Sequence, residues 1–415
     1  MIQLLPSAFQ GRFLIFAAIG LVSGVRLLGA ELLPRSPGRL GGDLDTRIVP
    51  RADTKEPFGR QDEVGDSLEM GLKVSSEHDD NIYFGAIDPR EDLVTKVAPA
   101  VAYRRGDDPE SRGGYLSVAY QPAAVIYAEH RDNNRVDQDL SWELGWRSRA
   151  IRIAHTGSAR HLGDATADTG TLTDRIELAN SLRVAWSPRE RLGIEVAVGR
   201  ETASYDSPVF RDSETDFGEV ALRYDYSPKT RLGLAYRAGR LDASSLGEQR
   251  IHRSTGRIEW QPTSKISVDL EAGVERRAFD NGSRTTPAIE ARVAWMAREG
   301  TEVYLGGYCR EQASAFLPGE NFSQGGVEVG ASQRLGGHWF GRIEGGVERA
   351  AYSRVSGTGI SGRVDRIRFI RPSLEYRFTD HFSMGLFYRH LVNRSNRETF
   401  GYESHGGGIE MGYRF

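Results

Sequence analysis

The sequence predicts an all-β protein, a closed antiparallel transmembrane β-barrel of about 18 strands, with about 16 as the alternative. Three observations lead to this expectation: apolar and polar residues alternate, short turns alternate with long polar connections, and no long apolar run follows the N-terminal segment. A period of two places one set of side chains on each face of a strand. Because every backbone polar group must be paired in hydrocarbon, strands cross a membrane only as a closed barrel.

The composition excludes other classes of protein. Hydrophobic residues make up 39% of the 415 residues and charged residues 27%, and glycine occurs 48 times. A bundle of membrane helices needs ~20 mostly apolar residues for each span, which the chain does not supply. The formal net charge of -3 gives no basic field for nucleic acid, and the single cysteine, Cys309, excludes an intramolecular disulfide.

Residues 1–30 are expected to be a secretory signal peptide. Arg12 precedes an apolar run over residues 13–28, and cleavage is expected after the small residue Ala30. A positive start, an apolar stretch and small residues at its end are typical of such peptides. The alternative is a retained anchor helix, for which the run is short and carries the charged Arg26.

A flexible periplasmic leader is expected over residues 31–67, where prolines recur without a helical or strand period, and the barrel over residues 68–415. The clearest alternation is at the end of the chain, where glycine and charged residues separate Ile409, Met411 and Tyr413. The expected strands cover residues 68–76, 92–104, 113–121, 123–131, 137–147, 150–156, 174–187, 191–201, 216–227, 231–240, 251–261, 265–276, 286–297, 301–310, 322–334, 338–349, 364–378, 381–391 and 406–415.

A single-chain bacterial barrel has an even number of strands, so two of the segments between residues 113 and 156 are expected to form one strand. Pro99, Pro122 and Pro372 fall inside expected strands, where each removes a hydrogen-bond donor from the ladder. We expect bulges or different boundaries at these prolines.

Short turns recur directly after an aromatic residue. Trp-Ser-Pro begins at residue 186, Tyr-Ser-Pro at 226 and Trp-Gln-Pro at 260. Proline presets the conformation of a turn and cannot continue the ladder. Aromatic residues favour strands in general, but amphipathic rings also prefer the headgroup level of a membrane, and their place before the short turns favours a girdle. The predicted periplasmic aromatic girdle consists of Trp186, Tyr226, Trp260, Trp295 and Tyr376.

Between the short turns lie longer connections rich in glycine, serine, aspartate, asparagine and arginine. Outer-membrane barrels have short periplasmic turns and longer extracellular loops, so we expect these connections outside, where they could fold inward and narrow the opening. The expected loops cover residues 157–173, 202–215, 241–249, 277–286, 311–321, 350–363 and 392–404.

Charged residues occupy one face of many expected strands. On a lipid-facing surface each arginine would cost ~2–4 kcal/mol at mid-bilayer, whereas in a water-filled bore it costs little. A soluble β-sandwich is the alternative, but it does not explain these charges or the sorting of short and long connections. The predicted lumen residues are Arg292, Arg342, Glu344, Glu375 and Arg377.

The chain ends on Tyr413-Arg414-Phe415 in an alternating strand. This ending resembles the terminal-strand signal of bacterial outer-membrane proteins that is read by the barrel assembly machinery, with Tyr413 and Phe415 as its aromatic residues.

Two segments carry a family resemblance: Glu-His-Asp-Asp-Asn-Ile-Tyr from residue 77, and Asp-Leu-Val-Thr from residue 92 followed by Pro99. They resemble the first hairpin of a β-barrel porin family of Gram-negative outer-membrane proteins, some of which are encoded with exopolysaccharide biosynthesis genes. The resemblance covers residues 68–415. It implies an outer-membrane barrel that serves as a conduit for polysaccharide or small solutes, and it supplies no catalytic residues.

The sequence offers little for catalysis. His390 could be grouped with Asn393 and Ser395, or His155 with Ser158, but a catalytic site needs a nucleophile, a base and an orienting group together. Residues 79–81 form an Asp-Asp-Asn cluster that could hold calcium, or that could turn the chain through Asx hydrogen bonds. We expect no catalytic residue, no cofactor and no metal.

The expected function is therefore a porin-like pore or transport conduit in the bacterial outer membrane, for exopolysaccharide or small hydrophilic solutes. The expected partners are outer-membrane lipid and the barrel assembly machinery. The alternatives are a non-conducting scaffold barrel that supports surface polymer export, and a barrel enzyme that acts on envelope lipid.

Overall fold

The computed structural model describes residues 66–107, 112–166, 168–243, 247–280, 282–317, 319–354 and 362–415. The expected signal peptide and nearly all of the expected leader lie outside these residues. Among the described residues, no helix has the length and apolar character needed to cross a bilayer.

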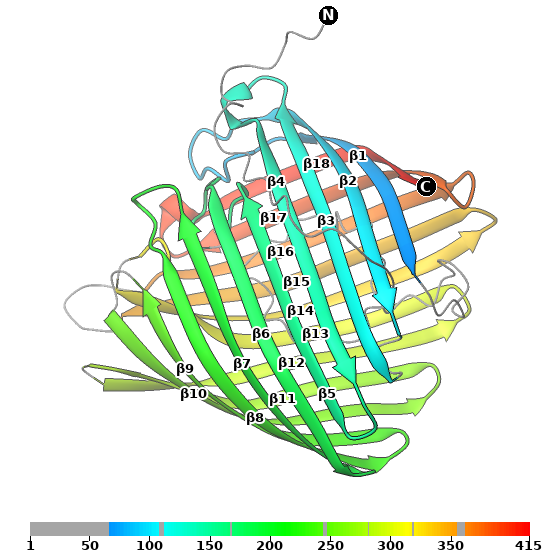
Figure 1. The fold of residues 1–415 in the computed structure, drawn as a ribbon. Helices are drawn as coiled ribbons and strands as arrows, with labels where there is room; N and C mark the ends of the chain where they lie inside the picture. The colour runs from blue at the N-terminus through cyan, green and yellow to red at the C-terminus, as the bar shows by residue number, and fades with distance from the viewer. Residues whose placement is uncertain are drawn as a thin grey trace, which may run out of the picture.

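Eighteen antiparallel strands form one closed barrel, which confirms the predicted fold class and strand number. The ring closes where β1 pairs with β18, from Gly71 opposite Arg414 to Asp79 opposite Gly406. In Figure 1 the cyan-to-green strands form the near wall and the yellow-to-red strands the far wall. The strands are β1 (Ser67–Asp79), β2 (Asp92–Gly106), β3 (Gly113–Tyr127), β4 (Arg135–Arg147), β5 (Ile151–Leu162), β6 (Arg175–Arg189), β7 (Leu192–Tyr205), β8 (Ser213–Ser227), β9 (Thr230–Ala243), β10 (Gly247–Thr263), β11 (Ile266–Phe279), β12 (Gly282–Arg298), β13 (Thr301–Ala313), β14 (Glu320–Gly336), β15 (Trp339–Arg354), β16 (Val364–Arg377), β17 (Phe382–Ser395) and β18 (Tyr402–Arg414).

The even number arises because the expected segment 113–121 and the first five residues of the segment 123–131 belong to the single strand β3, which ends at Tyr127. This strand continues through Pro122, which stands opposite Gln138 of β4. Two short 3-10 helices, η3 (Arg131–Asn133) and η4 (Glu398–Phe400), lie in the connections before β4 and before β18.

The bulges expected at the three prolines are absent from the described strands. Backbone pairing on one side of each proline is interrupted and then resumes in the same register. Between β2 and β3 the gap runs from the pair Val97–Ala124 to the pair Val101–Tyr120. Between β16 and β17 it runs from Ile370–His390 to Ser373–Phe387. A missing N–H therefore removes hydrogen bonds locally without adding a residue to either strand.

Most strands extend further toward the loop end than predicted. Residues 277–286, an expected loop, are almost entirely strand, because β11 ends at Phe279 and β12 begins at Gly282. Similarly, β9 ends at Ala243 and β10 begins at Gly247. The prediction ends each strand where its outward residues cease to be apolar. Outside the hydrocarbon layer, however, outward residues can be polar because water hydrates them, so neighbouring strands stay paired further along the chain.

Side chains alternate between a lipid-facing exterior and a charged interior. On β8, Val220 and Leu222 are 50% and 48% exposed, whereas Glu219 is 5% exposed and faces the lumen. A closed ring with an apolar exterior is the architecture of bacterial outer-membrane proteins. It places the protein in the outer membrane and rules out the β-sandwich alternative.

The apolar exterior is bounded at the loop end by charge. On β15, β16 and β17 the outward apolar residues give way to the exposed Arg349, Arg366 and Arg394, which stand directly opposite one another across the three strands. Arginine is unfavourable in the bilayer core but tolerated near the interfaces, so this row marks the extracellular edge of the apolar band.

The wall divides above this band between two strands. Pairing of β12 with β13 ends at Ile289 opposite Cys309, although both strands continue. Beyond that point the β13–β14 hairpin lies against other strands, because Asn321 of β14 exchanges two hydrogen bonds with Gln249 of β10. Arg277 of β11 also donates a hydrogen bond to the carbonyl of Glu311 on β13. The hairpin tip therefore leans into the mouth of the barrel.

We predict that Val329→Arg, which puts a charge on the middle of the exterior of β14, lowers the free energy of unfolding by ~2–4 kcal/mol. The matched control is Ser332→Arg, an inward position of the same strand opposite Glu302 and Arg342, which should change it by less than ~1 kcal/mol. Urea titration of the barrel in lipid vesicles measures both values. Equal costs at the two positions would contradict the assignment of the faces.

Candidate functional site

The inner wall carries a continuous network of opposite charges. Glu219 accepts hydrogen bonds from Arg237 at 2.9 Å and from Arg257 at 2.8 Å. Arg257 also bonds to Glu271 at 2.9 Å, and Glu271 accepts a further bond from Arg253 at 2.8 Å. These residues come from β8, β9, β10 and β11, so the network joins four adjacent strands. Both signs of charge thus line the bore as bonded pairs.

The predicted lumen residues lie on the inward positions of their strands. Arg377 bonds to Glu375 at 2.8 Å, and Arg342 approaches Glu344 at 3.9 Å. The guanidinium of Arg292 lies 5.0 Å from the centre of the Tyr304 ring. Their part in the passage of solutes stays a prediction.

A loop between β5 and β6, residues 163–174, crosses the extracellular mouth. Ala165 of this loop packs in a buried cluster with Ile367, Leu391 and Tyr402 of β16, β17 and β18. Leu172 packs against the same cluster and against a second one that includes Val125 of β3. Because these strands lie several places away around the ring, the loop reaches over the lumen instead of standing above its own strands.

Asp168 fastens this loop to the opposite side of the barrel. Its carboxylate accepts hydrogen bonds from the Ser314 hydroxyl at 2.7 Å and from the Ala315 backbone N–H at 2.6 Å. The Phe316 N–H lies 3.3 Å away and donates a third. These partners belong to the β13–β14 connection, eight strands from β5 around the ring of eighteen. One side chain therefore joins two loops across the mouth.

Arg363 holds a third segment in the same cluster. It donates a hydrogen bond to the carbonyl of Asp168 at 3.2 Å and is paired with Asp365 at 2.6 Å. Its guanidinium also lies 3.6 Å from the centre of the Phe400 ring, close enough for a cation–π contact. The cluster thus ties the loops before β6, β14, β16 and β18 together.

Burial raises the pKa of Asp168 above the ordinary value of an aspartate, while the Ser314 hydrogen bond and the positive charge of Arg363 oppose this shift. The hydrogen bonds are arranged to satisfy the carboxylate oxygens in a place that water does not reach freely. The side chain is suited to hold the loops together, because its hydrogen bonds run to the connection between β13 and β14.

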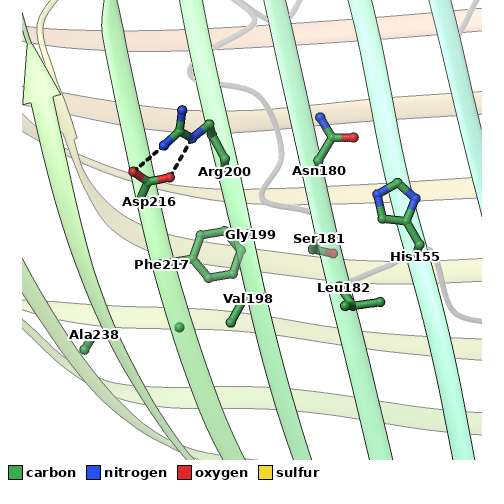
Figure 2. A pocket seen from close by; sticks show the side chains of 11 residues that line it. His155, Asn180, Ser181, Leu182, Val198, Gly199, Arg200, Asp216, Phe217 and Ala238 are labelled. Atoms are coloured by element: carbon green, nitrogen blue, oxygen red, sulfur yellow. Dashed lines mark hydrogen bonds and ion pairs between the residues drawn. The ribbon is translucent and has the colours of Figure 1, made fainter.

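A separate hollow of about 600 Å³ lies on the outer wall, over β5 to β9. Figure 2 shows its rim, where Arg200 and Asp216 form a two-pronged ion pair with hydrogen bonds of 2.7 and 2.8 Å. Leu182 and Val198 line the same hollow on outward positions. Most of its lining residues occupy outward positions, so the hollow is distinct from the charged network on the inner wall.

Strand alternation separates the residues that the sequence could group for catalysis. On β17, His390 points outward, whereas Asn393 is buried on the inner side and donates to the carbonyl of Phe400. On β5, His155 faces outward beside Trp142, whereas Ser158 is buried on the other face. Neither grouping forms a site.

The cluster at residues 79–81 turns the chain. The Asp79 carboxylate accepts a hydrogen bond from the backbone N–H of Asn81 at 3.0 Å and pairs with Arg389 at 2.6 Å. The cluster thus contains the Asx hydrogen bond of a turn, and its first carboxylate is paired with an arginine.

The predicted girdle residues lie at the short-turn end. Trp186, Trp260 and Trp295 are about half exposed on the exterior, and Tyr226 is more exposed. Tyr376 is partly covered by Trp339, whose ring centre lies 4.8 Å away. Their position fits a membrane interface, and the girdle itself stays a prediction.

The C-terminal residues also lie on the exterior. Tyr413 and Phe415 are exposed, and their ring centres lie 4.9 Å apart. The backbone N–H of Phe415 donates to the carbonyl of Met70, so the end of the chain continues the seam with β1. Recognition by the assembly machinery stays a prediction.

The sequence indicated the inward loops only in general terms. Asp168 and Arg363 are two of many polar residues in connections, and neither has a motif around it. Thr166 and Thr169 stand three residues apart in the sequence, and the structure places their buried hydroxyls 3.0 Å from one another. This spacing is a local signal that could have indicated an ordered loop.

Comparison with known proteins adds a general likeness. No family model matches the chain, and no curated protein matches it. Among solved structures, OpdQ of Pseudomonas aeruginosa is 10% identical, with a TM-score of 0.47, over 84% of this chain and 97% of its own. OccAB4 of Acinetobacter baumannii is 11% identical, with a TM-score of 0.47, over 85% and 99%. OpdK of Pseudomonas aeruginosa, solved with vanillate, is 11% identical, with a TM-score of 0.44, over 84% and 98%.

At these identities and scores the likeness says nothing about substrate. The barrel itself, with its closed ring of eighteen strands and charged bore, has the architecture of a bacterial outer-membrane β-barrel.

We predict that Asp168→Ala frees the β13–β14 connection. The N–H groups of Ala315 and Phe316 lose their acceptor, and a lost hydrogen bond of ~1.4 kcal/mol corresponds to roughly tenfold faster amide exchange. Hydrogen-exchange mass spectrometry of the peptide that contains residues 314–317 measures this rate. The control is Asp132→Ala in another extracellular connection, which should leave that peptide unchanged; unaltered exchange in the Asp168 variant would show that the carboxylate does not hold the loop.

Proposed function

We propose that the protein is an outer-membrane channel for small hydrophilic solutes, and that the loop of residues 163–174 sets the size limit of its opening. The observation that carries the proposal is the fastening of this loop across the mouth by Asp168 and Ser314. A loop bonded to the opposite side of the barrel is a fixed constriction, so it acts on every molecule that enters.

The interior supports a channel. Barrels of about 16 to 18 strands are wide enough to leave an aqueous passage between the side chains of opposite walls. The charged network on the inner wall needs water or partners around it, and an apolar filling would leave these groups poorly solvated. The bore is therefore suited to hydrated solutes.

The pairing of charges bears on selectivity. Glu219 and Glu271 each bond to two arginines, so the network presents three guanidinium groups and two carboxylates to the bore. Guanidinium groups bind carboxylates and sugar hydroxyls through directed hydrogen bonds. Such a wall suits polar solutes that carry several hydrogen-bonding groups.

Export of an exopolysaccharide is the finer possibility that the family resemblance suggests. A polymer strand would have to pass the same mouth, where Asp168, Arg363 and their partners hold four connections together. This arrangement favours small solutes over a polymer. The alternatives are a non-conducting scaffold and a barrel enzyme. The first experiment below separates the channel from the scaffold, and a lipase assay with alanine variants of the histidines tests the enzyme.

Single-channel recording in planar bilayers tests the channel. We expect discrete conductance steps from the wild-type barrel, and larger steps when an Asn-Gly turn replaces residues 163–174, since Leu162 and Arg175 are already directly paired. The control replaces Pro228-Lys229, in the short turn between β8 and β9 at the periplasmic end of the barrel, with Asn-Gly. This change should leave the conductance unchanged. Absence of steps from the wild type and from the loop variant would exclude a channel; steps of equal size would exclude the loop as the constriction.

Ion selectivity tests the charged network. We predict that Arg257→Ala makes the channel more cation-selective, because Glu219 and Glu271 each lose one positive partner that faces the bore. The measurement is the reversal potential under a gradient of potassium chloride. The control, Arg200→Ala, removes an arginine from the outer wall and should not change the reversal potential; a shift in the control as large as in Arg257→Ala would mean that the network does not face the passage.

A further inference from the structure

Three potential metal ligands meet on the outer face of β17 and β18. His390 of β17 stands directly opposite His405 of β18, and Glu403 lies two residues from His405 along the same strand. All three occupy outward positions. The sequence carries no metal-binding spacing here, and the register of the two strands brings the residues together.

The geometry of the three side chains is compact. The Nε2 atom of His390 lies 2.9 Å from Oε1 of Glu403, and the Nε2 atom of His405 lies 3.4 Å from the same oxygen. The two imidazole rings are stacked, with centres 4.3 Å apart and planes inclined by 10°. One ligand atom from each residue therefore lies within 4.8 Å of the other two.

The two nitrogen–oxygen separations, 2.9 and 3.4 Å, lie near those expected for two ligands on one zinc ion. With bonds of ~2.0–2.1 Å and tetrahedral angles, two ligand atoms of a zinc site lie about 3.3 Å apart. Two imidazole nitrogens and one carboxylate oxygen are ligands that zinc accepts, and three protein ligands leave a fourth position for water.

A fourth residue orients one of the rings. The hydroxyl of Tyr388 lies 2.7 Å from Nδ1 of His405, so the nitrogen that faces the cluster is Nε2. Metal-bound histidines usually hold their second nitrogen by such a hydrogen bond, which sets the orientation of the ring.

The barrel contains a natural comparison for this arrangement. Tyr236 of β9 and His252 of β10 form the same tyrosine–histidine pair on the outer face, with 2.7 Å between the hydroxyl and Nδ1. The position opposite His252 is Ala238, so a second imidazole is absent there. The tyrosine–histidine pair thus occurs without the metal ligands, and it serves as a control.

The cluster is accessible from outside the barrel. The side chains of His390, His405 and Glu403 are 33%, 42% and 57% exposed. Nearer the short turns, the outward positions within residues 382–388 and 409–415 are apolar and form the lipid-facing surface of the two strands. The cluster therefore lies at the extracellular edge of the membrane, where a hydrated ion can approach.

We propose that His390, Glu403 and His405 bind one divalent transition-metal ion, with zinc as the best match, on the outer surface of the barrel. The site is independent of the channel, because its residues face away from the lumen. A bound ion would link β17 to β18 through metal–ligand bonds, in addition to the backbone hydrogen bonds of the ladder. On its other edge, β18 pairs with β1 and closes the ring.

Isothermal titration of zinc chloride into the untagged full-length barrel in detergent tests the site. We expect one zinc ion per barrel for the wild type, and binding at least ~10-fold weaker for His405→Gln and for Glu403→Gln. Glutamine at position 405 can still accept a hydrogen bond from Tyr388, so this variant preserves the outer surface. Each variant is first shown to be folded by its heat-modifiable mobility in gels.

The control is His252→Ala, which should bind zinc as the wild type does. Tyr388→Phe should weaken binding without abolishing it, because the ligands remain while one ring loses its orientation. No heat above that of the buffer with the wild type, or equal affinity for the wild type and His405→Gln, would overturn the proposal. An equal loss of affinity in His252→Ala would also overturn it, because zinc would then bind to exposed histidines in general.

Discussion

In the hydrocarbon of a membrane no water is present to bond to the backbone, so each N–H and C=O group must find a partner in the protein. The closed ring of eighteen strands meets this requirement, and its last step is the seam between β1 and β18. Departures from full pairing are of two kinds. The lapses beside proline are short and keep their register within the strands, whereas the lasting separation of β12 from β13 begins at the extracellular edge of the apolar band.

The parting of β12 and β13 has a consequence for the mouth. Once the β13–β14 hairpin is free of β12, its tip can lean inward and meet the loop from β5 and β6. The Asp168 carboxylate accepts hydrogen bonds from the Ser314 hydroxyl and from the backbone N–H groups of Ala315 and Phe316. Arg363 in turn donates a hydrogen bond to the carbonyl of Asp168. The constriction is thus built from residues that lie outside the membrane, where irregular backbone can be hydrated or bonded to side chains.

Alternation along the strands determines what each surface can do. The inward face carries Glu219 and Arg257 in a network that needs water, and the outward face carries valine and leucine that need lipid. The same period separates His390 from Asn393, which removes a catalytic grouping, and it places His390 beside His405 of the next strand. A side chain therefore has few partners along its own strand and several across the ladder.

The sequence by itself determined the class of fold and the two faces of its clearest strands, because a period of two is a local property that neighbouring residues reveal. It favoured about 18 strands with about 16 as the alternative, and the structure has 18. Placement of Arg377 and Glu375 on one face follows from their spacing alone. Only the tertiary structure decided that Asp168 meets Ser314 and that His390 meets Glu403 and His405. Those contacts depend on the register of paired strands and on the width of the ring, which bring together residues that are distant in the chain. The strand ends toward the loops also had to come from the structure, since above the membrane outward positions no longer need to be apolar and the pattern that marks a strand is lost.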